Sequence, residues 1–291
     1  MNKLIKQNIS KLTGKTIAIT GTTGGLGSHV CLHLASAGAN LILINRSLHK
    51  SNQQKQELID KYPNIKVDIV QADLSNFESV KNATNILKQM SIDTLVLNAG
   101  IYHVPRFKTD IGYDNIFTTN FVSHYYMVKQ LLPTLRKSNN PSVVAVGSIA
   151  HDYCKLNTED IDYSKVDKHS KVYGNSKRFL MFSLYELFKN ESKVKLSVVH
   201  PGVTFTNITD HYPKLVYALI KYPMKILFPK PKKASLHIVD GIFNSTDYHY
   251  WIGPKILSVW GKPKLSKLTT CETSESIKIF NIAENIYNKL V

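Results

Sequence analysis

The segment KTIAITGTTGGLG, from Lys15 to Gly27, is the strongest indication of the fold in this sequence. A short β-branched run indicates a buried strand, and the glycines that follow it indicate a turn into a helix. Glycine permits positive φ and lets the backbone approach a pyrophosphate, whose charge is attracted by the free N–H groups of a helix N-terminus. The segment therefore predicts a dinucleotide phosphate site. Its candidate residues are Gly21, Thr23, Gly25, Leu26 and Gly27.

Short, nearly continuous apolar runs alternate with longer helical segments as far as His200. Such runs indicate strands buried on both faces, and repeated strand–helix units give a parallel sheet covered on both sides. The expected fold class is α/β, with one doubly wound parallel sheet in a single domain spanning 1–291. The expected strands are Lys15–Thr20, Asn40–Asn45, Lys66–Gln71, Thr94–Asn98, Ser142–Ser148 and Lys195–His200, and the expected helices are Leu26–Ala37, Lys50–Lys61, Phe77–Met90, Gly112–Lys137 and Tyr173–Asn190.

Beyond Pro201 this alternation ends. We divide the domain into a cofactor-binding and catalytic core, 12–203, and a C-terminal substrate-binding elaboration, 204–291, at the sheet edge. The elaboration is expected to hold a helix near Ala234–Phe243, an apolar run at Tyr248–Ile252 and a final helix near Ser274–Leu290. The apolar and basic stretch 215–233 is open to three interpretations: a core helix, a lid over an apolar substrate, or a peripheral membrane contact.

The composition favours anionic partners and excludes several classes of protein. Lysine and arginine number 37 against 21 acidic residues, a net charge of +16. No zinc-finger, helix-turn-helix or RNA-binding signature is present, so we expect no nucleic acid partner. Three scattered cysteines without clustered ligands indicate a reduced intracellular protein with no metal site. We find no signal peptide and no apolar run long enough to span a bilayer, and expect a cytoplasmic location.

The end of the second strand indicates which dinucleotide is bound. A carboxylate there, about 20 residues past the glycines, would hold the ribose 2′-hydroxyl of NAD. This chain has Arg46, whose guanidinium can pair with a 2′-phosphate, so we expect NADP(H). The alternative is a solvated surface arginine. His49 and Lys50 add positive field or are surface charges.

Two further strand ends complete the expected cofactor site. Asp73, followed by Leu74, is placed to bind an adenine amino group, or it is a plain helix N-cap. Asn98, Ala99 and Gly100 end the fourth strand. Small residues there leave space for a flat ligand, and Asn98 can tie neighbouring loops together.

The candidate chemical group is Ser148 with Tyr173 and Lys177. The last two lie one helical turn apart on one face of a helix. A neighbouring ammonium, with the positive charge of an oxidised nicotinamide, would lower the pKa of Tyr173 from its usual value of about 10. Tyr173 would then give a proton to a carbonyl oxygen held by Ser148 while hydride arrives at the carbon.

With these motifs in order, the sequence from about Gly14 to His200 resembles the short-chain dehydrogenase/reductase family, which has a Rossmann-type fold. The resemblance implies that Tyr173 is the general acid/base, that Lys177 binds the nicotinamide ribose, that Ser148 orients the carbonyl and that Asn120 holds a water in a proton relay. The matching residues are Thr20, Gly21, Gly25 and Gly27 in the TGxxxGxG turn, then Asn98, Ala99, Gly100, Asn120, Ser148, Tyr173 and Lys177, then Pro201, Gly202, Val203, Thr204 and Thr206 near the nicotinamide carboxamide and phosphates.

The departures from the commonest family pattern are informative. Ser148 and Tyr173 are separated by a longer stretch than in the commonest subgroup, and His151 follows Ser148. With Gly-Lys-Pro-Lys at 261–264, this resembles the retinol dehydrogenase-like and protochlorophyllide reductase-like branch, whose members often act on lipophilic carbonyls. Gly147 stands where many relatives carry serine, so contacts to the substrate oxygen can differ. We expect hydride transfer between NADP(H) and a carbonyl or alcohol that is lipophilic.

Several alternatives remain. A non-catalytic dinucleotide-binding regulatory protein could lose Tyr173 or Lys177, but both are present. His151 and Asp152 make a serine nucleophile conceivable, but Ser148 lacks the GxSxG elbow.

Two expectations concern helices. His124, on the helix of Asn120, is interpreted as a packed or surface histidine. The resemblance also implies a homo-oligomer built from the helices at Gly112–Lys137 and Tyr173–Asn190.

Overall fold

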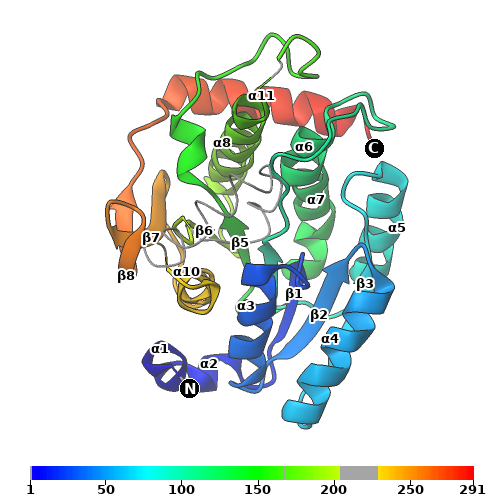
Figure 1. The fold of residues 1–291 in the computed structure, drawn as a ribbon, viewed down its shortest axis with the longest axis vertical. Helices are drawn as coiled ribbons and strands as arrows, with labels where there is room; N and C mark the ends of the chain where they lie inside the picture. The colour runs from blue at the N-terminus through cyan, green and yellow to red at the C-terminus, as the bar shows by residue number, and fades with distance from the viewer. Residues whose placement is uncertain (1, 167, 204–228) are drawn as a thin grey trace, which may run out of the picture.

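The computed structural model describes residues 2–166, 168–203 and 229–291. Their strands form one eight-stranded sheet in the order β3-β2-β1-β4-β5-β6-β7-β8, parallel except for β8 (Figure 1). The predicted doubly wound α/β fold is confirmed. The strands are β1 Thr16–Thr20, β2 Asn40–Asn45, β3 Val67–Gln71, β4 Thr94–Leu97, β5 Ser142–Val146, β6 Lys195–Val199, β7 Tyr250–Ile256 and β8 Trp260–Lys267.

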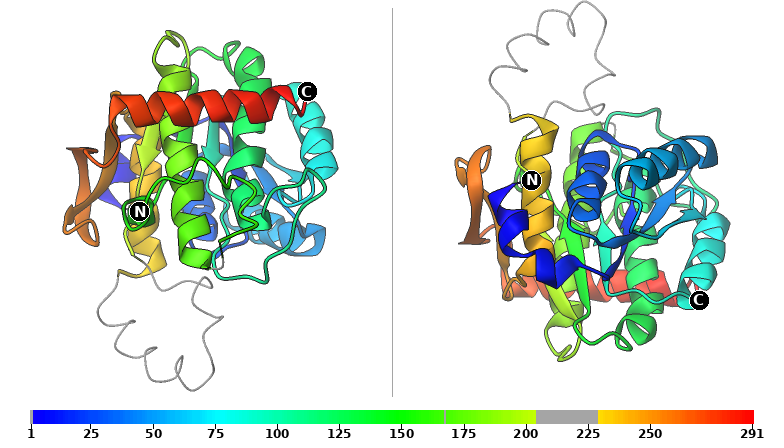
Figure 2. Two further views of the ribbon diagram at one scale, coloured as in Figure 1. Left: turned by 90° about the horizontal axis from the view of Figure 1, so that it is seen from above. Right: turned by 90° about the horizontal axis from the view of Figure 1, so that it is seen from below.

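Helices cover both faces of the sheet and close an apolar core on each (Figure 2). One face carries α1 Lys3–Gln7, α2 Ile9–Leu12, α3 Gly25–Ala35, α4 Leu48–Lys61 and α10 Pro231–Phe243. The other carries α5 Phe77–Lys88, α6 Asn115–Phe117, α7 Ser123–Leu135, α8 His169–Phe188 and α11 Thr273–Asn288.

The first strand shows why an apolar run without alternation predicted this sheet. Ile17 and Ile19 belong to one core, and Ala18 between them belongs to the other. Successive side chains of a strand point to opposite faces, so a strand between two helical layers needs an apolar residue at every position. All three are fully buried.

The strand order places a topological switch point beside β1. The chain moves from β1 outward to β2 and β3, then returns to pair β4 with the other side of β1. Loops that leave the carboxyl ends of β1 and β4 therefore diverge, and ligands of open α/β sheets bind at such a switch point. The glycine turn follows β1, and Asn98 follows β4.

The structure corrects the expected extent of several elements. The single helix expected at Gly112–Lys137 is instead α6, a π-helical turn η1 at Thr118–Val122, and α7. The helical segment begins at Asn115 rather than at Gly112, because the Asp114 side chain caps α6 by accepting from Ile116 N at 2.8 Å. The strands expected to reach Asn98 and Ser148 end at Leu97 and Val146.

The C-terminal strands extend the same sheet beyond β6. The apolar run expected at Tyr248–Ile252 contributes to β7, which pairs with β6 at Val199 and Ile252. Its antiparallel partner β8 was not predicted from the sequence, because glycine, proline and lysines interrupt any strand pattern there. The short helices α1 and α2 were also missed.

Candidate active site

The glycine turn has the close backbone packing that its sequence predicts. Gly21 has φ of 69°, and a Cβ there would lie 2.9 Å from Ala99 Cα. A Cβ on Gly27 would lie 2.3 Å from the Gly21 carbonyl oxygen. Thr23 and Gly24 are exposed at the tip of the turn, and Gly24 is the N-cap of α3. The turn thus presents backbone and a helix N-terminus outward, as an anion site requires.

Asn45 at the end of β2 holds the glycine turn in place through hydrogen bonds to Thr22, a role that the sequence did not indicate. Its Oδ1 accepts from Thr22 N at 2.7 Å, and its Nδ2 donates to the Thr22 hydroxyl at 2.7 Å. Gln54 of α4 donates from Nε2 to the Thr22 carbonyl at 2.9 Å. Thr22 is therefore a buried structural residue, and its neighbour Thr23 is the one that faces out.

Asn98 ties the fourth strand to the turn, as expected. Its Nδ2 donates to the carbonyls of Thr20 at 2.9 Å and Gly21 at 3.0 Å. In return the Thr20 hydroxyl accepts from the backbone N–H groups of Asn98 and Ala99, both at 3.0 Å. The two loops on either side of the switch point are thus fixed to each other.

The residues predicted to select the dinucleotide lie at neighbouring strand ends. Arg46 follows β2, is exposed, and its guanidinium makes no ion pair with any residue in the described ranges. The Asp73 carboxylate accepts from the backbone N of Ser75 at 2.9 Å and from its hydroxyl at 2.7 Å. Asn76, not Asp73, caps α5, so the N-cap alternative for Asp73 is wrong. Leu74 is buried beside it.

Ser148 and Tyr173 come together at the end of β5. The Ser148 hydroxyl lies close enough to the Tyr173 phenol to act on its pKa, and it accepts from Ala150 N at 3.2 Å as the cap of the 3₁₀ turn η2 Ile149–Asp152. Tyr173 stands in the second turn of α8, because α8 begins at His169 rather than at Tyr173 as expected. The centroid of the Tyr102 ring lies 4.9 Å from that of the Tyr173 ring, and nothing in the sequence indicated this contact.

Lys177 and Asn120 lie beside Gly100. The Lys177 Nζ donates to the Val146 carbonyl at 2.9 Å. A Cβ on Gly100 would lie 3.3 Å from that Nζ and 3.4 Å from Asn120 Oδ1, so a larger residue there would crowd both side chains. The structure thus brings Lys177 and Asn120 to the end of β4, where Asn98, Ala99 and Gly100 follow the strand.

Asn120 is buried within the π-helical turn η1. Its side chain exchanges two hydrogen bonds with the backbone of Ile101, at 2.8 and 3.0 Å, and donates to the Ser176 hydroxyl at 3.0 Å. π-turns are uncommon and occur frequently at functional sites.

Burial acts on both titratable groups of the cluster. It raises the pKa of the Tyr173 phenol, while the hydrogen bond from Ser148 lowers it and nearby Tyr102 raises it. It lowers the pKa of the Lys177 ammonium to about 8. The expectation that Lys177 lowers the pKa of Tyr173 is not met by the protein groups alone, because desolvation dominates and disfavours both charges.

His124 connects the turn to the π-helix. Burial lowers its pKa to about 3, so the imidazole is neutral. Its Nδ1 lies 3.2 Å from the Asn120 carbonyl, which can only accept, so Nε2 accepts from the Thr20 hydroxyl at 3.0 Å. His124 is thus a packed histidine, as expected, with a specific link that the sequence did not reveal.

The serine nucleophile alternative lacks its base. The His151 ring lies with Nδ1 at 2.6 Å from the Ser148 carbonyl oxygen and Nε2 at 2.6 Å from the Thr270 hydroxyl. Neither nitrogen reaches the Ser148 hydroxyl in these contacts, whereas nucleophilic catalysis needs that hydrogen bond.

The motif after β6 is described only in part. Pro201 and Gly202 are buried, Val203 is half-buried, and Gly202 has φ of 86°. Thr204 and Thr206, and 215–228 of the stretch 215–233, lie outside the described residues.

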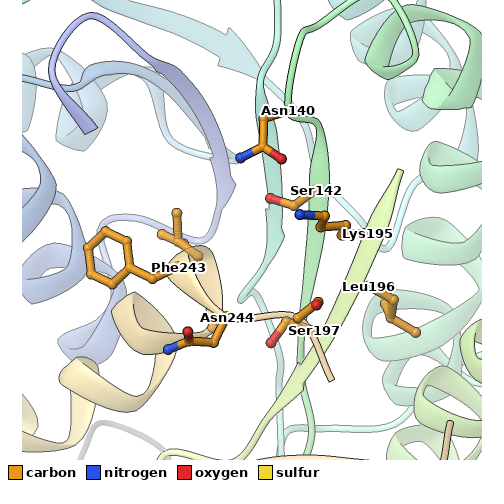
Figure 3. Close-up of a pocket in the computed structure, with 10 residues that line it drawn as sticks. Asn140, Ser142, Lys195, Leu196, Ser197, Phe243 and Asn244 are labelled. Atoms are coloured by element: carbon orange, nitrogen blue, oxygen red, sulfur yellow. The ribbon is translucent and has the colours of Figure 1, made fainter. Parts of the chain in front are cut away.

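A separate polar cavity of about 230 Å³ lies at the opposite edge of the sheet, by the first residues of β5 and β6 (Figure 3). Asn140, Ser142 and Lys195 line it, and none of the predicted site residues does. Over the described ranges, no group of three His, Cys, Asp or Glu side chains could hold a metal ion. No helix in the same ranges is long and apolar enough to cross a membrane.

Comparison with known proteins gives the family. A family model described as short chain dehydrogenase matches residues 15–214. Human polyprenol dehydrogenase is 30% identical over 203 residues, which cover 66% of this chain and 62% of that protein. Human retinol dehydrogenase 13 is 27% identical over 205 residues, which cover 69% of this chain and 62% of that protein. The chain belongs to the short-chain dehydrogenase/reductase family, in its retinol dehydrogenase-like branch.

A solved structure agrees on the fold. A short-chain dehydrogenase from Sphingobium yanoikuyae in complex with NADPH superposes with a TM-score of 0.60 at 21% identity, over 79% of this chain and 84% of that one. The curated relatives are longer than the part matched here, since the match spans 62% of each of the two named above.

Proposed function

We propose that this protein is an NADP(H)-dependent oxidoreductase that transfers hydride between the nicotinamide and a lipophilic carbonyl or alcohol. The observation that carries the proposal is the meeting of Ser148 and Tyr173 after β5, with Lys177 one turn along α8 and its Nζ at the end of β5. A phenol beside a second donor is what a carbonyl oxygen needs as it gains negative charge.

The described residues support a dinucleotide bound across the switch point. Gly21, Thr23, Gly25, Leu26 and Gly27 would hold the pyrophosphate at the N-terminus of α3, since Thr23 and Gly24 are open to solvent there. Asp73 and Leu74 would flank the adenine, and Asn98, Ala99 and Gly100 would face the nicotinamide half. Pro201, Gly202, Val203, Thr204 and Thr206 would complete that half of the site.

Arg46 is the reason for proposing NADP(H) rather than NAD(H) as the cofactor. Its guanidinium has no carboxylate partner among the described residues and would pair with a ribose 2′-phosphate by charge-assisted bonds. The structural relative from Sphingobium yanoikuyae binds NADPH, which supports the choice.

In carbonyl reduction, Ser148 would hold the substrate oxygen and Tyr173 would pass its proton to that oxygen. The bound nicotinamide supplies the hydride, or accepts it in the reverse direction. Burial keeps Tyr173 protonated, the form that a general acid needs. Lys177 would bind the nicotinamide ribose. Asn120, with its side chain fixed between Ile101 and Ser176, would hold a water in a relay that returns the proton to Tyr173.

The substrate class is proposed from the surroundings of Tyr173 and from the relatives. The aromatic ring of Tyr102 packs beside the Tyr173 phenol. Two relatives are named as dehydrogenases of polyprenol and of retinol, both of them lipophilic alcohols.

We further propose that the protein is cytoplasmic, contacts membranes peripherally through 215–233 and forms homo-oligomers. α11 already lies across α7 and α8 (Figure 2, left), where Lys129 pairs with Glu284 at 2.8 Å. Any homo-oligomer built on those two helices therefore has to use the surface that α11 leaves uncovered.

The test follows NADPH and NADH absorbance against a panel of aldehydes and ketones that differ in chain length. The proposal expects turnover with NADPH, faster for longer apolar substrates, and a loss of roughly 100-fold in Ser148→Ala. Stoichiometric NADPH binding without turnover of any substrate would instead favour the dinucleotide-binding regulatory protein. Tighter binding of NADH than of NADPH would reject the role of Arg46.

A further inference from the structure

The hairpin of β7 and β8 ends in an unusual turn at the margin of the molecule (Figures 1 and 2). Leu257 and Ser258 have φ of 49° and 54°. Turns that need positive φ at two successive residues favour glycine, asparagine and aspartate, and the left-handed region is unfavourable for a leucine. Leu257 is nevertheless 80% exposed, and the adjoining Ile256 is 54% exposed.

This leucine contributes little to the stability of the fold. A single exposed apolar residue is ordinary and needs no explanation. Leu257, however, combines an unfavourable backbone conformation with a side chain that packs on almost nothing. Asparagine at this position would be easier to fold and more soluble. A leucine that lowers stability in both respects indicates that its side chain acts on something outside the chain.

The charge of the hairpin indicates which kind of partner the Leu257 side chain contacts. Residues 250–267 contain four lysines and no aspartate or glutamate, and all four lysines are exposed. Lys262 and Lys264 alternate along β8 and so share one face. An apolar tip followed by lysines matches an anionic lipid surface, in which leucine enters the headgroup layer and lysines remain with the phosphates.

The hairpin tip is fixed to the active-site edge of the sheet. β7 runs parallel to β6, so its carboxyl end lies at the edge where Gly202 follows β6. The His200 ring lies with Nε2 at 3.0 Å from the Ser258 carbonyl oxygen. A Cβ on Gly202 would lie 2.8 Å from the Val259 carbonyl oxygen. The tip therefore contacts His200 and Gly202, at the start of the loop that is proposed to hold the nicotinamide.

We propose that Ile256 and Leu257 at the tip of the β7–β8 hairpin insert into anionic membrane surfaces, with Lys255, Lys262 and Lys264 bound to the headgroups. This docking turns the active-site edge toward the bilayer, where a lipophilic substrate is concentrated. That last consequence rests on the proposed function; the membrane contact itself does not. The surface is distinct from the stretch 215–233.

The test is co-sedimentation of the full chain with vesicles of phosphatidylcholine alone and of a two-to-one mixture with phosphatidylserine. We expect binding to the mixed vesicles only. Leu257→Asn should weaken it by about tenfold, because most of one leucine side chain is no longer buried. Lys262→Gln and Lys264→Gln should each weaken it by about fivefold.

The matched control is Ile86→Asn, which removes a side chain that is 53% exposed on α5. It should bind vesicles as the unmodified chain does. Leu257→Asn should not lower the thermal midpoint and should raise it slightly, since asparagine tolerates positive φ better than leucine, and it should keep turnover of a water-soluble aldehyde.

Three results would overturn the proposal. The first is equal vesicle binding by Leu257→Asn and the unmodified chain, and the second is equal binding to neutral and anionic vesicles. The third is a change of oligomeric state in Leu257→Asn, because it would assign the tip to a second copy of this chain. Failure of the proposed function would look different, since the unmodified chain would then bind vesicles without reducing any carbonyl.

Discussion

Gly27→Ala tests whether the glycine turn is shaped by backbone contact. The new Cβ would lie 2.3 Å from the Gly21 carbonyl oxygen and 2.8 Å from Thr22 Cα, both of them backbone atoms. Forcing an extra methyl group into such a site costs about 1–3 kcal/mol, and these short distances indicate the upper end. Alanine regains about 1 kcal/mol as a better helix former in α3.

The net expectation is a loss of about 2 kcal/mol in the free energy of unfolding, which lowers the thermal midpoint by about 5 °C. The turn must open to admit the methyl group, so NADPH binding should weaken by at least about tenfold. Calorimetry measures the first effect, and fluorescence titration of NADPH measures the second.

Gly24→Ala is the matched control in the same turn. A Cβ there would lie 3.5 Å from the Gly21 carbonyl oxygen, an ordinary contact, and Gly24 has φ of −80°. It should therefore change the thermal midpoint and NADPH binding little. If Gly27→Ala matched Gly24→Ala in both measurements, the contact argument for the turn would be refuted.

Three further changes give separate expectations. Arg46→Ala should weaken NADPH binding by about 10- to 100-fold and leave NADH binding unchanged, as titration calorimetry would show; equal losses for both would reject the 2′-phosphate pairing. The depressed pKa of Lys177, about 8 in the fold against 10.5 ordinarily, means that the unfolded chain binds the extra proton between these values. The free energy of unfolding, measured in urea, should therefore rise by roughly 3 kcal/mol across that pH window in the unmodified chain and not in Lys177→Met. An equal dependence of the free energy of unfolding on pH in the two proteins would contradict this. His124→Leu leaves the Asn120 carbonyl and the Thr20 hydroxyl without their imidazole partner, so urea unfolding should show a loss of about 2–4 kcal/mol, whereas the exposed His49→Leu should show almost none.

The sequence predicted what depends on local pattern. The strands with two buried faces, the turn after β1 and the spacing of Tyr173 and Lys177 on α8 all follow from neighbouring residues, and the structure bears out these elements. β8 could not be predicted, because it forms only by pairing with β7 and its sequence contains Gly261 and Pro263.

The contacts within the site depend on segments far apart in the chain. His124 links Thr20 to Asn120, and Tyr102 meets Tyr173 only because two loops leave the same sheet edge. The raised pKa of Tyr173 was missed for the same reason: the charge of Lys177 is visible in the sequence, whereas the burial that opposes it is a property of the folded chain.

The most direct measurement compares Tyr173→Phe with Tyr153→Phe, a matched change at a tyrosine that is 76% exposed. NADPH affinity and the rate of carbonyl reduction are measured for both under saturating cofactor. We expect Tyr173→Phe to bind NADPH normally but to reduce the carbonyl roughly 10²–10⁴-fold more slowly, whereas Tyr153→Phe should change neither NADPH affinity nor the rate of reduction. Reduction by Tyr173→Phe at the rate of the unmodified protein would contradict this expectation.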